Sequence, residues 1–336
     1  MLTLSGESIN ELFVQACAAV LDRGAEVSPR GMRTREVLGA WLCLSRPRRR
    51  VLGVPPRVFN PAFAAAEAVW MLSGSDAPWI YEFNQKLTAY ADDGRLHGAY
   101  GPRLRRWAGR TGQVDQLERV VSVLSGDPDS RRALVQLFDP ARDHRGYRDV
   151  PCTLGWRFYL REGRLHLHTT MRSQDLWLGF PYDVFTFTVL QELVAGWLGV
   201  AVGDYHHHVD SLHLYERHWD GAREACRPAG QVPPCPVMAP LQVSWPELDP
   251  LLEHLATGAE GPGLPLSGDL SGTGWAQFAV VMASYRRWKH GDRHSARTLA
   301  DENPGVLTDA LTRWYDHLAL PVTATGTRTS AAGATA

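Results

Sequence analysis

The residues best suited to covalent chemistry lie between positions 150 and 183. Cys152 follows Pro151 and precedes an alternating apolar run, so we expect its sulfur at the entrance of a strand, facing a cavity. A cysteine becomes a nucleophile when nearby cations favour its thiolate, and the candidate cations are Arg131, Arg132 and Arg172. An isolated cysteine is more often a small buried apolar residue. The assignment therefore depends on a fold that brings these cations close to the sulfur.

Arginine side chains also indicate an anion site, because the guanidinium fork binds phosphate oxygens through two hydrogen bonds. The side chains that we assign to phosphate binding are Arg30, Arg131, Arg132, Arg172 and Ser173. Other arginines of the N-terminal region are interpreted as solvated surface: Arg33, Arg35 and Arg48 to Arg50.

A run of three histidines, His206 to His208, raises the possibility of a metal site, with His213 and His218 nearby. Histidine is a common zinc ligand. Successive side chains of a strand point to opposite faces, however, so the three cannot converge on one ion. We therefore predict no metal.

The composition is that of an ordinary globular chain, with 44% hydrophobic and 21% charged residues and a net charge of -1. A near-neutral charge argues against binding to DNA or to a membrane surface. No apolar run is long enough to span a membrane and no N-terminal signal is recognisable, so we expect a cytoplasmic protein. The five cysteines form no CxxC pair and are interpreted as free thiols.

Apolar periodicity outlines the elements that must position these residues. Helical spacing predicts helices over 8–23, 62–72, 113–124 and 185–198, and a helix starting at 212. Alternation predicts strands at 37–44, 133–138, 154–160, 164–171 and 205–208, with loops over 98–107 and 226–265. The mixed order favours an α+β fold in which a mixed sheet packs against helices. We expect one domain over residues 1–320 and a disordered tail over 321–336.

Seven motifs, in chain order over about two-thirds of the sequence, resemble the thymidylate synthase family. They are Glu67 in Glu-x-x-Trp-x-Leu-x-Gly, Tyr100-Gly101, Arg131-Arg132, Pro151-Cys152, the run from Arg172-Ser173-x-Asp175 to Leu178-Gly179-x-Pro181, His207, and His213-x-Tyr215. No single motif is specific, but their order is.

The resemblance implies a covalent mechanism on a pyrimidine nucleotide. Cys152 would add to C6, C5 would then attack the one-carbon unit of methylenetetrahydrofolate, and Glu67 with Tyr100 would serve removal of the C5 proton. His207 would lie in the nucleotide pocket. The sugar 3′-hydroxyl would be bound by His213 and Tyr215, and the folate by Asp175.

The same resemblance implies a homodimer with shared active sites. In the family the double-arginine motif, here Arg131-Arg132, reaches the neighbouring subunit's site, and the sheets stack across the dimer interface.

Asp183 stands where thymidylate synthases carry Asn. Uracil presents an N3–H donor beside the O4 acceptor, and cytosine reverses the pair. A protonated carboxyl matches cytosine, because one oxygen accepts from the 4-amino group and the other donates to N3. Burial raises a carboxyl pKa and so favours the protonated form. The alternative is a helix N-cap before residues 184–198, a position that Asp favours. We predict cytosine recognition, although the two roles are not exclusive.

Three departures from the family pattern favour water addition over hydride transfer. Thr153 replaces the usual His after the nucleophile, residues 87–91 lack the tryptophan pair upstream of Tyr100, and residues 323–336 lack the closing C-terminal segment. In the family the tryptophan and the closing segment shield the reaction intermediate from water. We therefore predict a 5-hydroxymethylase of CMP or dCMP. The alternatives are a thymidylate synthase acting on dUMP and a non-catalytic regulatory or RNA-binding relative.

Overall fold

The computed structural model describes residues 1–227, 232–258 and 273–320. The predicted tail over 321–336 lies outside the described residues, as does part of the predicted loop over 226–265. No helix within the described ranges is long and apolar enough to cross a membrane.

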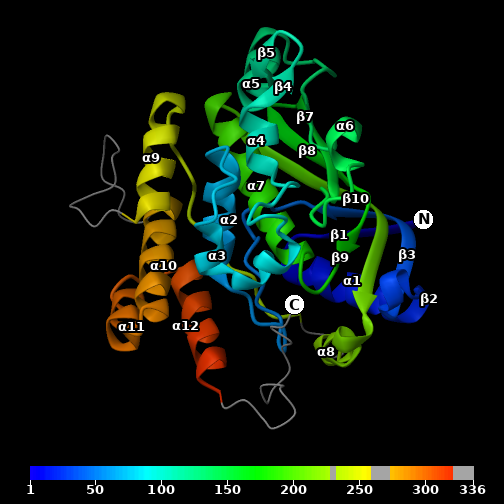
Figure 1. Cartoon of the computed structure of the whole chain (residues 1–336), viewed down its shortest axis with the longest axis vertical. Helices are drawn as coiled ribbons and strands as arrows, with labels where there is room; N and C mark the ends of the chain where they lie inside the picture. The colour runs from blue at the N-terminus through cyan, green and yellow to red at the C-terminus, as the bar shows by residue number, and fades with distance from the viewer. Residues whose placement is uncertain (228–231, 259–272, 321–336) are drawn as a thin grey trace.

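One mixed sheet organises the chain (Figure 1). Its strand order is β1 (Leu2–Gly6), β3 (Thr34–Leu44), β10 (Ala201–Tyr215), β8 (Arg164–Met171), β7 (Thr153–Arg161), β6 (Leu134–Gln136). The pairs β1–β3 and β10–β8 are parallel, whereas β3–β10, β8–β7 and β7–β6 are antiparallel. The short strand β2 (Ala25–Val27) pairs with β3, and β9 (Gln174–Asp175) pairs with β10. A separate two-stranded sheet is formed by β4 (Trp107–Gly109) and β5 (Gly112–Val114). The predicted α+β class with a mixed sheet is confirmed.

Helices cover the sheet on one side in successive layers. The first layer is α1 (Ile9–Arg23) with α7 (Phe180–Trp197), and α2 (Pro61–Leu72) packs on α7. The C-terminal helices α9 (Trp245–Thr257), α10 (Gly274–Lys289) and α12 (Val306–Ala319) pack against α2, on its side away from the sheet (Figure 1). The remaining helices are α3 (Ile80–Phe83), α4 (Tyr100–Arg105), α5 (Gln116–Gly126), α6 (Pro140–Asp143), α8 (Trp219–Ala225) and α11 (Arg293–Asp301). Three 3₁₀ segments complete the described elements: η1 (Pro29–Gly31), η2 (Gln85–Tyr90) and η3 (Glu216–His218).

Helix α7 is buried on all sides because its sequence is apolar on all sides. Two of its four buried polar residues bond to other parts of the core through their side chains. Gln191 donates to backbone carbonyls of the sheet, and Glu192 pairs with Arg50. Arg50 is fully buried, so its interpretation as solvated surface was wrong.

The elements differ most from the predicted ones in four places. Residues 100–105 form α4 instead of a loop, and α7 begins at Phe180, five positions before the predicted start. Strand β10 continues to Tyr215, so no helix starts at 212. Residues 245–257 form α9 within the predicted loop.

The opposite face of the sheet is only half buried. Alternate side chains of β8 and β10 point there, whereas their neighbours in sequence point toward α7. The side chains on this half-buried face include Trp41 and a group of histidines next to it: His166, His168, His206 and His208.

Candidate active site

Cys152 lies immediately before β7, and Arg172 encloses it from the end of β8. The backbone N–H of Arg172 donates to the Cys152 carbonyl over 2.9 Å. Its guanidinium donates to the carbonyls of Pro151 and Val150, both at 3.0 Å, and lies 3.7 Å from the Cys152 sulfur. The fold thus brings one of the three predicted cations to the sulfur.

The charges around the Cys152 thiol act on its pKa in opposite directions. Burial raises its pKa above the ordinary value, the nearby positive charges of Arg172 and Arg30 oppose that rise, and the negative charges of Asp183 and Asp149 add to it. The fold thus places positive charge from Arg172 and Arg30 near the thiol, and activation of Cys152 as a nucleophile remains a prediction.

Tyr100 reaches the nucleophile from α4. Its hydroxyl oxygen accepts from the backbone N–H of Thr153 over 3.2 Å. Burial raises the Tyr100 pKa well above its ordinary value, so the phenol stays protonated. Its own hydrogen remains available to a group bound beside Cys152.

Glu67 on α2 and Asp183 on α7 are two half-buried carboxyl groups of the same site. Burial raises the Glu67 pKa to about 8, and the negative charge of Asp183 contributes to the rise. Burial likewise raises the Asp183 pKa to about 7, although a hydrogen bond from Gln174 opposes it. Glu67 therefore keeps its proton near neutral pH, whereas Asp183 is only partly protonated there.

Asp183 is not the N-cap of α7. Gly179 occupies that position, and Asp183 lies within the first helical turn. Its Oδ2 accepts from the Gln174 side-chain amide over 2.8 Å. The N-cap alternative is therefore wrong, although an acid in the first turn still gains from the helix dipole when ionised.

Asp175 and the His-x-Tyr motif lie side by side where β9 pairs with β10. Oδ1 of Asp175 accepts from the backbone N–H groups of Trp177 and Leu178 at 2.8 and 2.9 Å, which fixes the carboxyl. Its other oxygen makes no such backbone contact and is the one suited to a folate. His213 and Tyr215 share one face of β10, with ring centroids 5.2 Å apart.

Arg30 joins this group although it stands on the short η1 segment, with a left-handed φ of 53°. Its positive charge opposes the rise in the Tyr215 pKa and also acts on Cys152. Arg30 and Arg172 are therefore two arginines of the same chain whose charge acts on the nucleophile.

Arg131 and Arg132 lie elsewhere in the chain. They are exposed on the connection between α5 and β6. The carbonyl of the next residue, Ala133, accepts from Phe158, which places the pair beside the far half of β7. That position is about six residues from Cys152, roughly 20 Å at the usual rise per residue. A single chain does not bring them to the sulfur.

The three successive histidines divide between the two faces of the sheet. His207 points inward toward Gln174 and Phe180, whereas His206 and His208 point toward Trp41 on the other face. Their divergence agrees with strand geometry.

One group of ligand-type side chains was not foreseen. Among the described residues, potential ligand atoms of Cys43, Asp204 and His206 lie within 4.8 Å of one another. The Trp41 indole donates to Nδ1 of His206 over 3.2 Å, which occupies one of its two nitrogens. The absence of a metal remains a prediction.

Sequence reasoning missed Gln174, Tyr205 and Asp149. Gln174 stands at the unspecified position of the Arg-Ser-x-Asp motif, and Tyr205 shares the inward face of β10 with His207. Two-residue periodicity along β10 was the signal for Tyr205. Asp149 accepts from the Gly98 backbone and faces the nucleophile, which no local pattern indicates.

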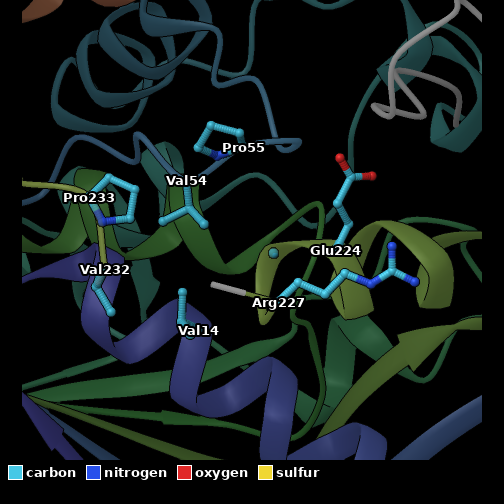
Figure 2. Close-up of a pocket in the computed structure, with 8 residues that line it drawn as sticks. Val14, Val54, Pro55, Glu224, Arg227, Val232 and Pro233 are labelled. Carbon is cyan, nitrogen blue, oxygen red and sulfur yellow. The ribbon is translucent and has the colours of Figure 1, made fainter. Parts of the chain in front are cut away.

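A separate hollow of about 360 Å³ lies between α1 and α8 (Figure 2). None of the predicted site residues lines it. Its walls are mainly apolar, with Glu224 and Arg227 at one side: Val14, Val54, Pro55, Glu224, Ala225, Arg227, Val232 and Pro233.

A half-buried cysteine beside an arginine, with a tyrosine and two carboxyl groups of raised pKa around it, is an arrangement suited to nucleophilic group transfer. The sequence profile of the family described as thymidylate synthase matches residues 11–244. The chain belongs to the thymidylate synthase family.

Two curated relatives are named deoxyuridylate hydroxymethyltransferase. The protein of Bacillus phage SP01 is 35% identical over 226 residues, covering 64% of this chain and 59% of the relative. The protein of Pseudomonas phage M6 is 36% identical over 176 residues, covering 51% of this chain and 49% of the relative. The chain thus spans about half to three-fifths of the length of these relatives.

Proposed function

We propose that the chain is a pyrimidine nucleotide 5-hydroxymethylase that acts on CMP or dCMP, with methylenetetrahydrofolate as one-carbon donor and water as the second reactant. Family membership and the names of the relatives support 5-hydroxymethylation of a pyrimidine nucleotide. The single observation that carries the choice of base is the half-buried Asp183 carboxyl, whose pKa is about 7 and whose Oδ2 is held as an acceptor by Gln174.

In the proposed reaction the Cys152 sulfur bonds to C6 of the base, which makes C5 nucleophilic. C5 takes the one-carbon unit, and its proton leaves toward the Glu67 and Tyr100 side of the site. Tetrahydrofolate departs and leaves an exocyclic methylene group. The oxygen of water bonds to that methylene, and release of the sulfur from C6 gives the 5-hydroxymethyl nucleotide.

The residues around Cys152 suit these roles. Arg172 lies 3.7 Å from the sulfur and is positioned for the phosphate or the thiolate. Glu67 holds a proton near neutral pH because its pKa is about 8, so it can exchange protons with water during the reaction. Asp175, fixed through Oδ1, is our candidate for the folate contact.

Deoxyuridylate hydroxymethylation is the second candidate, favoured by the names of the two relatives. A protonated carboxyl can also pair with uracil, with the opposite oxygen carrying the proton. Asp183 therefore supports cytosine only if its two oxygens are not interchangeable.

We also propose a homodimer with shared sites. Arg131 and Arg132 are exposed and roughly 20 Å from the nucleophile of their own chain. The half-buried sheet face and the 71% exposed Leu38 on β3 offer a surface for a second copy. Stacking of two such faces would bury apolar area in the way obligate dimers do.

Tritium release from 5-tritiated nucleotides, with simultaneous measurement of the folate product, tests the reaction type. A hydroxymethylase releases tritium and forms tetrahydrofolate, whereas a thymidylate synthase oxidises the folate to dihydrofolate because hydride is transferred. We expect release without dihydrofolate. Formation of one dihydrofolate per tritium would identify methylation, and no release from any cytosine or uracil nucleotide would leave a non-catalytic relative.

A further inference from the structure

A chain of hydrogen bonds runs from the sheet to the Asp183 carboxyl. The Tyr205 hydroxyl lies 2.6 Å from Nδ1 of His207, and Nε2 of His207 lies 2.9 Å from Oε1 of Gln174. Gln174 in turn donates from Nε2 to Oδ2 of Asp183 over 2.8 Å. Tyr205, His207 and Gln174 are buried, so their polar atoms depend on these partners.

We call the series Tyr205, His207, Gln174 and Asp183 the relay. Each of its hydrogen bonds is donated toward Asp183. The amide oxygen of Gln174 can only accept, so Nε2 of His207 donates to it. Burial lowers the His207 pKa to about 3, so the imidazole is neutral and its Nδ1 accepts from the Tyr205 hydroxyl. The relay therefore ends with a hydrogen bond donated to Asp183.

The backbone of Asp175 prevents the Gln174 amide from turning over. Its carbonyl accepts from Nε2 of Gln174 at 3.3 Å. A reversed amide would place Oε1 against this carbonyl, and two acceptors would face each other. The same nitrogen thus contacts Asp175 and Asp183, and both contacts require it to be the donor.

Gly179 leaves the space through which the relay passes. A Cβ at this position would lie 2.8 Å from Nε2 of Gln174 and 3.3 Å from the Asp175 carbonyl. The φ of Gly179 is −81°, which any residue adopts. Space, and not backbone conformation, is therefore the reason for a glycine here.

We propose that Gln174 is a positioning residue for base specificity: its amide makes Oδ2 of Asp183 an acceptor and leaves the proton of the carboxylic acid on Oδ1. This inference rests on the proposed function, in which the Asp183 carboxyl faces the edge of the base. The carboxyl then presents its donor and acceptor in one order. Cytosine and uracil present opposite orders at N3 and at position 4, so only one base pairs with both oxygens. Without Gln174 the proton can lie on either oxygen, and the acid accommodates both bases.

Replacement of the amide by an apolar side chain of similar length, Gln174→Met, tests the relay. The measured quantity is the ratio of kcat/KM for cytosine over uracil monophosphates. We expect a wild-type ratio that departs from one by more than about tenfold, since buried groups without partners discriminate strongly. The variant brings the ratio about tenfold or more closer to one, chiefly by raising activity on the disfavoured base.

Gln191→Met is the matched control. It removes another buried glutamine, whose amide donates to the Leu165 and Gly203 carbonyls away from the site. Its ratio stays at the wild-type value. An unchanged ratio in folded Gln174→Met, or equal losses on both bases, overturns the proposal. Should Gln174→Met fail to fold, Gly179→Ala displaces the flexible amide end sterically and is judged by the same ratio.

Asp183→Asn separates failure of the relay from failure of the proposed function. With Gln174 present, the new amide takes the same order as the acid, so the preferred base is unchanged. The decline in kcat/KM that wild type shows above about pH 7, as Asp183 ionises, is lost. Reversal of base preference in this variant overturns the relay but leaves Asp183 as the residue that reads the base. A wild type that prefers uracil overturns the choice of cytosine, while Gln174→Met must still move the ratio toward one.

Discussion

Cys152 is the residue on which the covalent mechanism depends, and its replacement should separate chemistry from binding. Cys152→Ala removes the sulfur that bonds to C6 but leaves Arg172, Asp183 and the sugar-binding side chains in place. We expect turnover to be lost and nucleotide dissociation constants to change by less than about tenfold. Equilibrium binding and tritium release measure the two quantities. Substantial product from Cys152→Ala would exclude the nucleophile assignment.

The half-buried Glu67, with its raised pKa, should make stability depend on pH. Its pKa is about 8 in the folded chain, compared with 4.5 for the ordinary group, so unfolding releases its proton between these values. Each pH unit in that window lowers the free energy of unfolding by up to about 1.4 kcal/mol from this group. Stability contributed by the protonated form is therefore complete below about pH 4.5 and is lost as pH rises to 8.

Glu67→Gln should flatten this dependence. Urea unfolding between pH 5 and pH 8 measures it, with the exposed Glu118→Gln on α5 as control. A variant whose slope equals that of wild type would show that Glu67 is ionised in the folded chain.

At the scale of elements, α4 illustrates how tertiary contacts place a site residue. Arg103 is buried and its two terminal nitrogens donate to both oxygens of Asp143, at 2.7 and 2.6 Å. The same guanidinium donates to the carbonyls of Leu137 and His97. This cluster anchors the short helix that carries Tyr100.

Removal of one partner from this cluster should be costly. Asp143→Ala leaves a buried guanidinium without its carboxylate, so we expect a loss of about 3–5 kcal/mol in the free energy of unfolding. Asp249→Ala, which removes the 67% exposed partner of Arg105, should cost less than about 1 kcal/mol. Similar values for the two variants in denaturant titrations would exclude a structural role for the Arg103–Asp143 pair.

Local periodicity predicted the elements that are long and amphipathic or buried. The ranges predicted for α1, α2 and β8 agree closely with the structure, because each has a clear apolar period. It failed for α4, whose six residues are held by Arg103 rather than by their own propensity. The helix predicted at 212 was wrong because the alternation of His213 and Tyr215 continues the strand.

The site was predicted as a set of residues but not as a network. Motif order identified Glu67, Tyr100, Cys152 and Asp183, and the fold brings these four together. Gln174 was passed over because its contacts join β9, β10 and α7, segments that no local pattern relates. Contacts across elements depend on the fold, so sequence spacing alone does not reveal them.

At the scale of the whole molecule, the separation between Cys152 and Arg131 is the basis of the proposed homodimer. Arg131→Ala and Cys152→Ala should each be inactive alone if the arginine serves the partner's site. In a mixed dimer one site then carries both defects and the other carries neither. Mixing with subunit exchange should restore up to about a quarter of wild-type activity, since half of random dimers are mixed and have one intact site.

The control for this experiment is a mixture of two variants in one site, Cys152→Ala with Glu67→Gln, which both act within their own chain and should not complement. Absence of complementation by Arg131→Ala, with exchange confirmed by mass spectrometry of the native dimers, would mean that each site is built from one chain.

Direct competition between nucleotides tests whether this member of the thymidylate synthase family hydroxymethylates a cytosine nucleotide. Wild-type protein receives methylenetetrahydrofolate with equal amounts of CMP, dCMP, UMP and dUMP, and chromatography with mass analysis identifies each product. We predict 5-hydroxymethyl products of the cytosine nucleotides in more than about tenfold excess over those of uracil. Predominant conversion of dUMP, as the names of the phage relatives would suggest for them, would contradict the account.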